Sequence, residues 1–278
     1  MKALLWVNKR FKLPQHPFNM RNNGEKTYAM WQYEKGIDTV KSYLKFTDSD
    51  AMFKDKVVLD IGCGAAGKSL FYANCGAEKV YGLDILPQYK DESETLAKQL
   101  NLQDKFEFVL GDAAKMDFPD NSFDTIIMND AMEHVDEPEK VLEECARVLK
   151  KGGKLFVNFP PYNHPFGAHL SDAVAIPWVH LFFSEQTLIN GYKELVKDLP
   201  DGEARIKFRI ATDKNGKEYF SYINKMTLKR FKKIKENLTA MQLIHYSEEP
   251  LRPVVSLLAK MPVLKEGFVR MAVCVFEK

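Results

Sequence analysis

The sequence predicts an α/β protein built on a doubly wound, largely parallel β-sheet. Between residues 57 and 159, short apolar runs alternate with longer amphipathic stretches. A glycine-rich turn follows the first run, and an acidic residue ends each of the first two. Strands that alternate with helices at this spacing pair in parallel through right-handed crossovers. The expected strands are 57–60, 79–84, 106–110, 123–129 and 154–159, and the expected helices are 69–74, 91–100 and 139–149.

The first predicted strand runs directly into the glycine-rich turn. Gly62, Gly64 and Gly67 form a G-x-G-x-x-G pattern, and a helical stretch begins at Ser69. This order places backbone N–H groups at a helix N-terminus, which suits a ligand that comes close to the main chain. The pattern alone also fits a dinucleotide. Asp60, the last strand residue, favours a ligand with a cationic group, because a carboxylate here would not stabilise a negatively charged pyrophosphate.

Polar residues also end the next strands, and open α/β sheets bind ligands at the carboxyl edge of their strands. Asp84 ends the second strand and can accept hydrogen bonds from both hydroxyls of a ribose. Asp112 ends the third strand and can accept from an adenine amino group, while the Ala113 N–H donates to a ring nitrogen. Asn129 and Asp130 end the fourth strand, within reach of an amino-acid portion. The alternative role for the strand-end acids is a helix N-cap.

Six segments together resemble the class I S-adenosylmethionine-dependent methyltransferases, and most closely the small-molecule branch typified by quinone-biosynthesis methyltransferases. The resemblance implies a Rossmann-like sheet of seven strands, mostly parallel with an antiparallel last strand. It also implies S-adenosyl-L-methionine as cofactor and S-adenosyl-L-homocysteine as product. The segments are 59–64, 82–84, 111–113, 121–124, 130–135 and 147–153, within a stretch of 55–160.

The same resemblance assigns a cofactor site. Ala66 departs from the family pattern, because many members have a glycine there, and we expect an altered turn that still binds. The residues expected to bind the cofactor are Asp60, Gly62, Cys63, Gly64, Gly67, Asp84, Ile85, Asp112, Ala113, Asn129 and Asp130.

The alternation of strands and helices breaks after the fifth strand. Residues 160–224 form a long insertion, which favours a functional substrate cap over an idle loop. Residues 1–50 are expected to form an N-terminal arm and a lid helix, for which simple packing on the domain is the alternative. Residues 51–278 are then the cofactor-binding domain that carries the insertion.

The remaining elements follow from local signals. Asn215-Gly216 predicts a hairpin turn, and Gly152-Gly153 is expected to end the helix before it as a C-cap. An extended arm is expected at 13–18, one or two helices at 25–46, strands at 206–210 and 218–222, a helix at 227–238, a strand at 242–246, a helix at 254–260 and a strand at 268–276.

Histidines and aromatic residues in and near the insertion are candidates for catalysis and substrate binding. A histidine that titrates near neutrality can deprotonate a hydroxyl as it attacks the methyl sulfonium, and the candidates are His134, His169 and His164. A structural role is the alternative for each of them. No metal site is expected, since the spacing of the His and Asp residues matches no recurrent ligand pattern. The candidate substrate residues are Tyr28, Trp31, Tyr162, Phe166, Trp178 and His180.

The charge distribution argues against a polyanionic substrate. The net charge of +2 divides into +4 over residues 1–50, −9 over 51–192 and +7 over 193–278. An acidic middle is a poor groove for nucleic acid. Residues 225–235 form a basic helix that could contact a membrane or a polyanion, but a solvated outer face is the simpler interpretation.

Other features bear on compartment and on competing functions. Four scattered cysteines fit a reducing cytoplasm, and we expect neither a signal peptide nor a membrane span. The sequence therefore predicts a cytoplasmic enzyme that methylates a small, hydrophobic or aromatic acceptor, on oxygen before carbon. The alternatives are an RNA or protein methyltransferase that uses the basic helix, and a cofactor-binding protein without catalysis. The stretch 158–162 looks like an N-P-P-Y motif interrupted by Phe159, and it is interpreted as a strand exit.

Overall fold

The structure is a computed structural model of residues 1–278, described here for all residues except 23, 25, 253, 255–256 and 262–263. Its contacts divide the chain into two compact units. The sheet unit comprises residues 26–159, 229–248 and 272–278, and the insertion unit comprises residues 1–25, 160–228 and 249–271. Each unit is described by itself.

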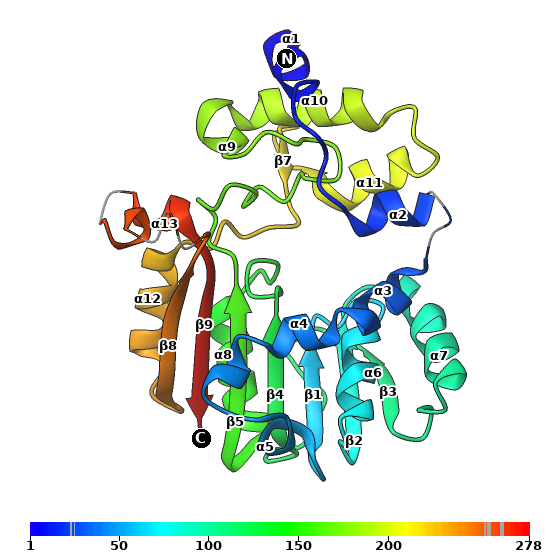
Figure 1. Cartoon of the computed structure of the whole chain (residues 1–278), viewed down its shortest axis with the longest axis vertical. Coiled ribbons are helices and arrows are strands. Elements are labelled where there is room, and N and C mark those ends of the chain that lie inside the picture. Colours follow the sequence, from blue (N-terminus) through cyan, green and yellow to red (C-terminus); the bar gives the residue numbers. More distant parts are fainter. Residues whose placement is uncertain (23, 25, 253, 255–256, 262–263) are drawn as a thin grey trace. The chain divides into compact units, whose positions relative to one another are not determined.

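The sheet unit contains a seven-stranded sheet in the order β3-β2-β1-β4-β5-β9-β8 (Figure 1). Strands β1 to β5 pair in parallel, and β9 is antiparallel to β5. The fold class and the antiparallel end of the sheet are therefore confirmed. The strands are β1 (Val57–Ile61), β2 (Lys79–Asp84), β3 (Phe106–Leu110), β4 (Phe123–Asn129), β5 (Leu149–Phe159), β8 (Gln242–Pro250) and β9 (Val269–Glu277).

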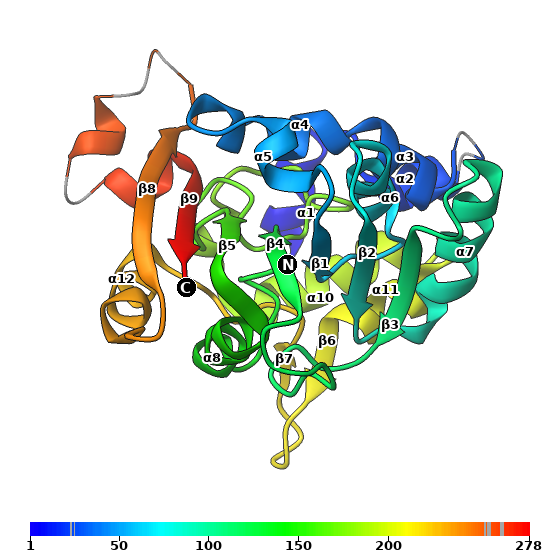
Figure 2. The same ribbon diagram turned by 90° about the horizontal axis from the view of Figure 1, so that it is seen from below.

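Helices cover both faces of this sheet, with α4, α5 and α6 on one face and α8 and α12 on the other (Figure 2). The central strands are mainly apolar because both of their faces are buried. The helices and 3-10 turns of this part of the chain are α3 (Tyr28–Glu34), α4 (Gly36–Val40), η1 (Tyr43–Lys45), α5 (Ser49–Phe53), α6 (Gly67–Asn74), η2 (Pro87–Tyr89), α7 (Lys90–Gln99), α8 (Pro138–Val148) and α12 (Leu228–Asn237).

The glycine pair after α8 has a different role from the one expected. Helix α8 ends at Val148 and β5 begins at once, so Gly152 and Gly153 lie inside the strand and do not cap the helix. Gly152 has φ +78° and donates its N–H to the Lys278 carbonyl. A Cβ on Gly153 would lie 3.0 Å from the Asp124 carbonyl oxygen. The two glycines thus permit the irregularity between the Phe123 and Thr125 pairings of β4 with β5.

The insertion unit is mostly helical, with one short hairpin. The Asn215-Gly216 turn is confirmed between β6 (Ile210–Thr212) and β7 (Glu218–Phe220), which pair antiparallel. Its described helices and 3-10 turns are α1 (Lys2–Asn8), α2 (Pro17–Asn22), α9 (Val179–Phe182), α10 (Glu185–Val196), α11 (Gly202–Arg209), η4 (Leu258–Lys260) and α13 (Lys265–Phe268).

Three predictions for this unit need correction. The strand expected at 206–210 is mainly helix α11, and the extended arm at 13–18 turns into α2 at Pro17. Only part of the helix expected at 254–260 can be judged, because residues 255–256 lie outside the described residues, and residues 258–260 form a 3-10 turn. Among the described residues, no helix is long and apolar enough to cross a membrane.

A buried ionic cluster explains why residues 202–209 are helical. Arg205 and Arg209 stand four residues apart, so a helix places both on one face, where they meet Asp172. Arg205 Nη1 lies 3.1 Å and Arg209 Nη2 2.9 Å from the two Asp172 carboxylate oxygens, and Tyr192 donates to the same carboxylate at 2.8 Å. The alternating Ile206, Phe208 and Ile210 imitate a strand pattern, but the arginine spacing decides the local structure.

Candidate cofactor and catalytic site

The glycine-rich turn joins β1 to α6 in left-handed backbone conformations. Gly62 and Gly64 have φ of +70° and +56°, and the N–H groups of Gly62 and Cys63 both donate to the Leu83 carbonyl of β2. Ala66 also has a left-handed φ of +59°, which costs an alanine about 1 kcal/mol relative to glycine. Ala66 is the N-cap of α6 and makes no side-chain cap, so the left-handed conformation at this position is adopted by an alanine.

Helix α3 packs on this turn, and Gly67 makes the contact possible. A Cβ on Gly67 would lie 1.9 Å from the Ala29 carbonyl oxygen and 2.6 Å from the Tyr33 nitrogen. The Gly67 N–H donates to Gln32 Oε1 at 3.2 Å, and Gln32 Nε2 donates to the Cys63 carbonyl. The third glycine of the motif therefore serves packing between helices. Gln32 was not predicted, and the only signal for it in the sequence is a glutamine within an aromatic helix.

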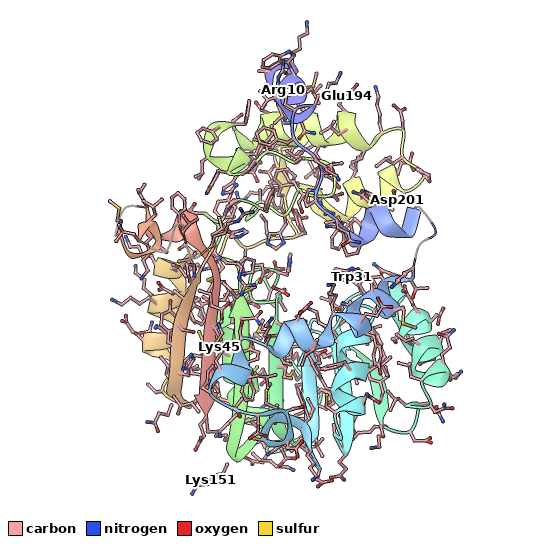
Figure 3. All side chains as sticks on the ribbon, in the orientation of Figure 1. Arg10, Trp31, Lys45, Lys151, Glu194 and Asp201 are labelled. Carbon is pink, nitrogen blue, oxygen red and sulfur yellow. The ribbon has the colours of Figure 1, made fainter. Side chains whose placement is uncertain are left out.

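Two of the expected substrate residues lie on the same helix. Tyr28 approaches the glycine turn, since a Cβ on Gly64 would lie 3.4 Å from its ring. Burial, together with the charges of Asp130 and Asp84, holds the pKa of Tyr28 above its ordinary value, so the phenol stays neutral. Trp31, which is labelled in Figure 3, stacks with Tyr28 at a centroid distance of 6.2 Å. Both aromatic residues are thus close to the turn that is expected to bind the cofactor.

Asp60 is a buried carboxyl group at the end of β1. Only 3% of its surface is exposed, and Ser69 Oγ donates to Oδ2 at 2.6 Å. Burial raises the pKa of Asp60 to about 6, and the Ser69 hydroxyl and the Lys68 charge oppose that rise. The carboxyl does not cap α6, because Ala66 holds the N-cap position. A cationic ligand group nearby would stabilise its charged form.

We expect the affinity for S-adenosylmethionine to rise with pH through about 6, the pKa of Asp60. Below this pH the carboxyl is protonated and loses its attraction for a cationic amino group, so affinity falls by up to about tenfold per pH unit. Without ligand the raised pKa acts in reverse: the stability it contributes is present at acid pH and is lost as pH rises through 6. Titration calorimetry across this range tests the expectation, and Asp60→Asn should flatten the profile. An unchanged slope in that variant would contradict it.

Asp84 and its neighbours form the second part of the site. Its Oδ2 accepts from the Gly64 N–H at 2.8 Å and its Oδ1 from the Leu86 N–H at 2.9 Å. Each oxygen keeps acceptor capacity for one further donor. Burial raises the pKa of Asp84, while the backbone N–H groups that bond it oppose the rise. Ile85 beside it is 65% exposed, an apolar surface available to a flat ring.

The third and fourth strand ends differ from each other. Asp112 is exposed, and its Oδ1 accepts from the Ala114 N–H at 2.8 Å, while Ala113 is nearly buried. Asp130 has a left-handed φ of +51° and forms an ion pair with Lys68 at 3.2 Å. Both acids are therefore available at the carboxyl edge of the sheet.

Asn129 has its side chain committed to the protein. Its Oδ1 accepts from Tyr43 Oη and from Asn158 Nδ2, both at 2.7 Å, and its Nδ2 donates to Tyr72 Oη at 3.1 Å. Since all these bonds are buried, the side chain holds the strand ends in place and is not free to bond a ligand. Residue Asn158, from the interrupted N-P-P-Y stretch, is thus a strand residue at the end of β5, as interpreted from the sequence.

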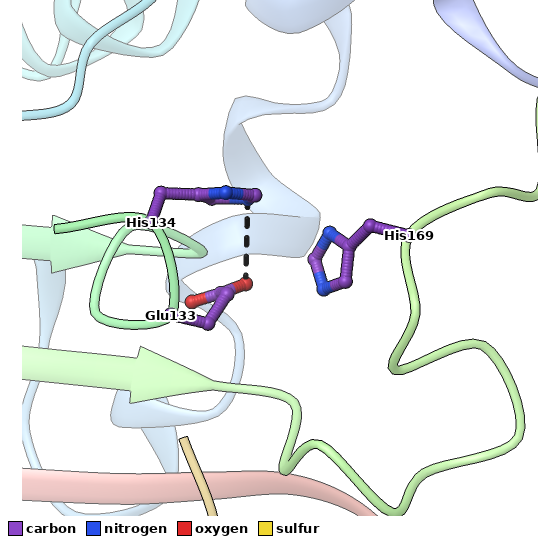
Figure 4. A group of neighbouring side chains, drawn as sticks. All are labelled: Glu133, His134 and His169. Carbon is purple, nitrogen blue, oxygen red and sulfur yellow. Dashed lines mark ion pairs between the residues drawn. The ribbon is translucent and has the colours of Figure 1, made fainter. Parts of the chain in front are cut away.

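His134 follows β4 and lies beside an acid that the sequence analysis missed. Its Nε2 is 3.9 Å from Glu133 Oε1 (Figure 4). Glu133 is buried, which, together with the charge of Asp130, raises its pKa well above the ordinary value. The sequence offered one signal, a glutamate directly before the histidine. A buried acid beside an exposed imidazole is an arrangement suited to proton transfer.

The other candidate residues belong to the insertion unit. His164 Nδ1 accepts from the Phe166 N–H at 3.2 Å, and burial, with the nearby His180 and Arg270, lowers the pKa of His164 to about 4. The Nδ1 lone pair of His164 is therefore occupied by a hydrogen bond, which makes this histidine a poor base. The His180 ring packs at a tilt against the Tyr162 ring, with 4.7 Å between centroids, and burial lowers the pKa of His180 to about 4 as well.

Two further residues of this unit have strained backbones. Trp178 and His169 have φ of +54° and +51°. The Trp178 indole donates to the Gly267 carbonyl at 3.1 Å, and the His169 carbonyl accepts from Tyr222 Oη at 2.7 Å. Left-handed residues of this size persist only where their surroundings hold them, and they cluster at functional sites.

The sheet order, the glycine turn after β1 and the acids at or just beyond the ends of β1, β2 and β3 match the arrangement expected for a class I S-adenosylmethionine-dependent methyltransferase domain. Residues 59–157 match the family model described as "Methyltransferase domain". A ubiquinone biosynthesis O-methyltransferase of Coxiella burnetii is 33% identical over 141 residues, 49% of this chain and 56% of that protein. A sterol 24-C-methyltransferase of Gibberella zeae is 41% identical over 96 residues, 34% of this chain and 25% of that protein.

The solved structures agree on the fold. A SAM-dependent methyltransferase from Methanosarcina mazei superposes with a TM-score of 0.50 at 22% identity, covering 82% of this chain and 95% of that one. The chain spans 25% to 56% of the length of the two curated relatives above.

Proposed function

We propose that the protein transfers a methyl group from S-adenosylmethionine to a small, hydrophobic or aromatic acceptor, on oxygen in preference to carbon. The observation that carries the proposal is the position of Asp84. Its two oxygens bond the glycine turn on one side and the start of the next segment on the other, and both retain capacity for ribose hydroxyls. Asp60, one strand away in the sheet, supplies a buried negative charge for the amino-acid end.

The chain's own residues have limited tasks in such a reaction. S-adenosylmethionine brings a methyl group already activated on its sulfonium, so alignment of the acceptor supplies much of the rate. Asp60, Asp84 and the glycine turn would orient the cofactor. His134, supported by Glu133, is the candidate to take a proton from an acceptor hydroxyl. His164 is less suited because the Phe166 N–H occupies its Nδ1.

The proposal for the acceptor class rests on two observations. The insertion unit supplies aromatic and histidine side chains, among them Tyr162, Phe166 and Trp178. Two of the matching relatives are named for O-methylation in ubiquinone biosynthesis and for C-methylation of a sterol. Oxygen is preferred because a histidine base helps a hydroxyl more than a carbon–carbon double bond.

The competing function would use the basic helix α12 on RNA or protein. In the structure, Phe231 and Ile234 of α12 are buried, and its Lys229, Lys232 and Lys233 are exposed. Lys235 lies 3.4 Å over the Tyr246 ring of the adjacent strand. This is the pattern of an ordinary helix that packs on a sheet and leaves its charged side in solvent.

A labelled-methyl experiment tests the proposed function. The protein is incubated with methyl-labelled S-adenosylmethionine and a whole metabolite extract, with RNA and protein as separate acceptors. We expect label in a solvent-extractable product that releases it on ether cleavage, since an O-methyl group is cleaved and a C-methyl group is not. The Asp84→Ala protein is the control that should lose the label. Label confined to RNA or protein would support the competing function.

A further inference from the structure

The N-terminal segment, residues 1–13, is firmly attached to the insertion unit. Leu4 of α1 is fully buried in its core, and a Cβ on Gly191 of α10 would come within 2.3 Å of the Leu4 side chain. Asn8 Nδ2 donates to the Ala173 carbonyl at 2.9 Å, and Asn8 Oδ1 accepts from the Ala175 N–H at 2.8 Å. These contacts of Leu4 and Asn8 hold the segment in one orientation, so the residues on its opposite side face the solvent.

The outward side combines large apolar side chains with basic ones. Trp6, Phe11 and Leu13 are 60%, 44% and 42% exposed. Residues 1–24 contain five Lys and Arg and no Asp or Glu. The basic residues Lys2, Lys9, Arg10 and Lys12 are all exposed, and Arg10 is labelled in Figure 3. Exposed aromatic residues among unbalanced positive charges are unusual on a surface that faces only water.

The rest of the insertion unit also combines exposed apolar residues with a net positive charge. Helix α9 exposes Leu181 and Phe182, while its Val179 packs in the same core cluster as Leu4. The insertion unit holds seventeen basic and eleven acidic residues, a formal charge of +6. The sheet unit holds twenty-three basic and twenty-seven acidic residues, a charge of −4. Positive charge is thus concentrated in the unit that carries the exposed apolar residues.

We propose that the N-terminal segment docks on the surface of an anionic lipid bilayer. Trp and Phe side chains partition into the boundary between headgroups and acyl chains, and neighbouring Lys and Arg side chains are attracted to anionic headgroups. The guanidinium of Arg10 lies 3.4 Å over the Trp6 ring and donates to the Trp6 carbonyl at 3.0 Å, so the charge and the indole form one amphipathic group. The proposal needs no particular methyl acceptor.

A nucleic acid is the other polyanion that could use these charges, and the structure favours it less. One face of Trp6 is already covered by Arg10, so the indole has a single face left for stacking on a base. Leu13 and Leu181 offer aliphatic surface with no ring to stack on a base and no hydrogen-bonding group for a base or a phosphate. Aliphatic surface gains free energy in a lipid interface and gains nothing on a nucleic-acid backbone.

Co-sedimentation with vesicles tests this proposal, using phosphatidylcholine vesicles with and without phosphatidylglycerol. The full chain should bind the anionic vesicles, bind the neutral ones far more weakly and dissociate as salt is raised. The triple variant Lys9→Gln, Arg10→Gln, Lys12→Gln should lose about a hundredfold in affinity. Trp6→Ala with Phe11→Ala should also lose binding, although Leu4 and Asn8, which hold the segment, are untouched.

The matched control removes the same charge from the other basic surface. Lys229→Gln, Lys232→Gln and Lys233→Gln on α12 should change affinity by less than about threefold, because α12 belongs to the acidic sheet unit. The proposal is overturned if the α12 variant loses binding and the N-terminal variant keeps it, or if neither vesicle binds. Binding of a labelled RNA oligonucleotide that depends on Lys9, Arg10 and Lys12, without vesicle binding, would also overturn it. None of these results depends on methyl transfer.

Discussion

Replacing Asp84 by alanine is expected to weaken S-adenosylmethionine binding by a factor of roughly 10² to 10⁴, measured by titration calorimetry. If Asp84 binds the ribose as proposed, the change removes two charge-assisted hydrogen bonds to it, each of about 1.5–3 kcal/mol. It also releases the Gly64 N–H from Oδ2, at 2.8 Å, and the Leu86 N–H from Oδ1. The loss thus combines missing ligand contacts with a glycine turn that is no longer held in position.

Two control variants separate these contributions. Asp91→Ala removes the same charge from the exposed start of α7 and should leave the affinity within about twofold. Asp84→Asn keeps one acceptor oxygen near the ribose and should fall between the wild type and the alanine variant. Unchanged affinity in Asp84→Ala, in a protein that remains folded, would remove Asp84 from the cofactor site.

The second large effect concerns stability. Asp172→Ala is expected to lower the free energy of unfolding by about 3–5 kcal/mol, because it leaves two buried guanidinium groups without their shared carboxylate. The Asp172 side chain is 0% exposed, and the side chains of Arg205 and Arg209 are 2% and 3% exposed. The Tyr192 hydroxyl, which donates to the same carboxylate at 2.8 Å, would lose its acceptor too.

Urea unfolding followed by circular dichroism measures this effect. Asp201→Ala is the matched control: it removes the other carboxylate bonded to Arg205, at 3.0 Å, but from a side chain that is 30% exposed. That variant should cost less than about 1 kcal/mol. Equal losses of unfolding free energy in the two variants would show that the burial of Asp172 does not determine how much the cluster stabilises the protein.

The cofactor half of the site could be predicted because its signals are local in sequence. Asp60 and the glycine turn lie within eight residues, and the first four expected strands differ from the observed ones by at most one residue at an end. A polar residue lies at or within two residues of the end of each of these strands, and the parallel order of β3, β2, β1 and β4 brings those residues to one edge. A short motif and the rule for ligand position in such sheets were sufficient.

The remaining features depend on contacts that are distant in sequence. Gln32 reaches Gly67 across 35 residues, and Arg209 reaches Asp172 across 37. No sequence motif marks either pair of residues. The sequence therefore could not show that α3 packs on the glycine turn or that α11 is a helix. Glu133 was not predicted for a different reason. The neighbouring His134 was the more obvious candidate for catalysis, and the burial of Glu133 can be seen only in the structure.

The most direct test of the central claim is a pair of calorimetric titrations of the intact chain, one with S-adenosylmethionine and one with NAD. The buried Asp60 and the two-sided bonding of Asp84 predict saturable binding of S-adenosylmethionine with one site per chain, and no measurable binding of NAD. Binding of S-adenosylmethionine should disappear in the Asp84→Ala protein. Tight binding of NAD without binding of S-adenosylmethionine would contradict the account.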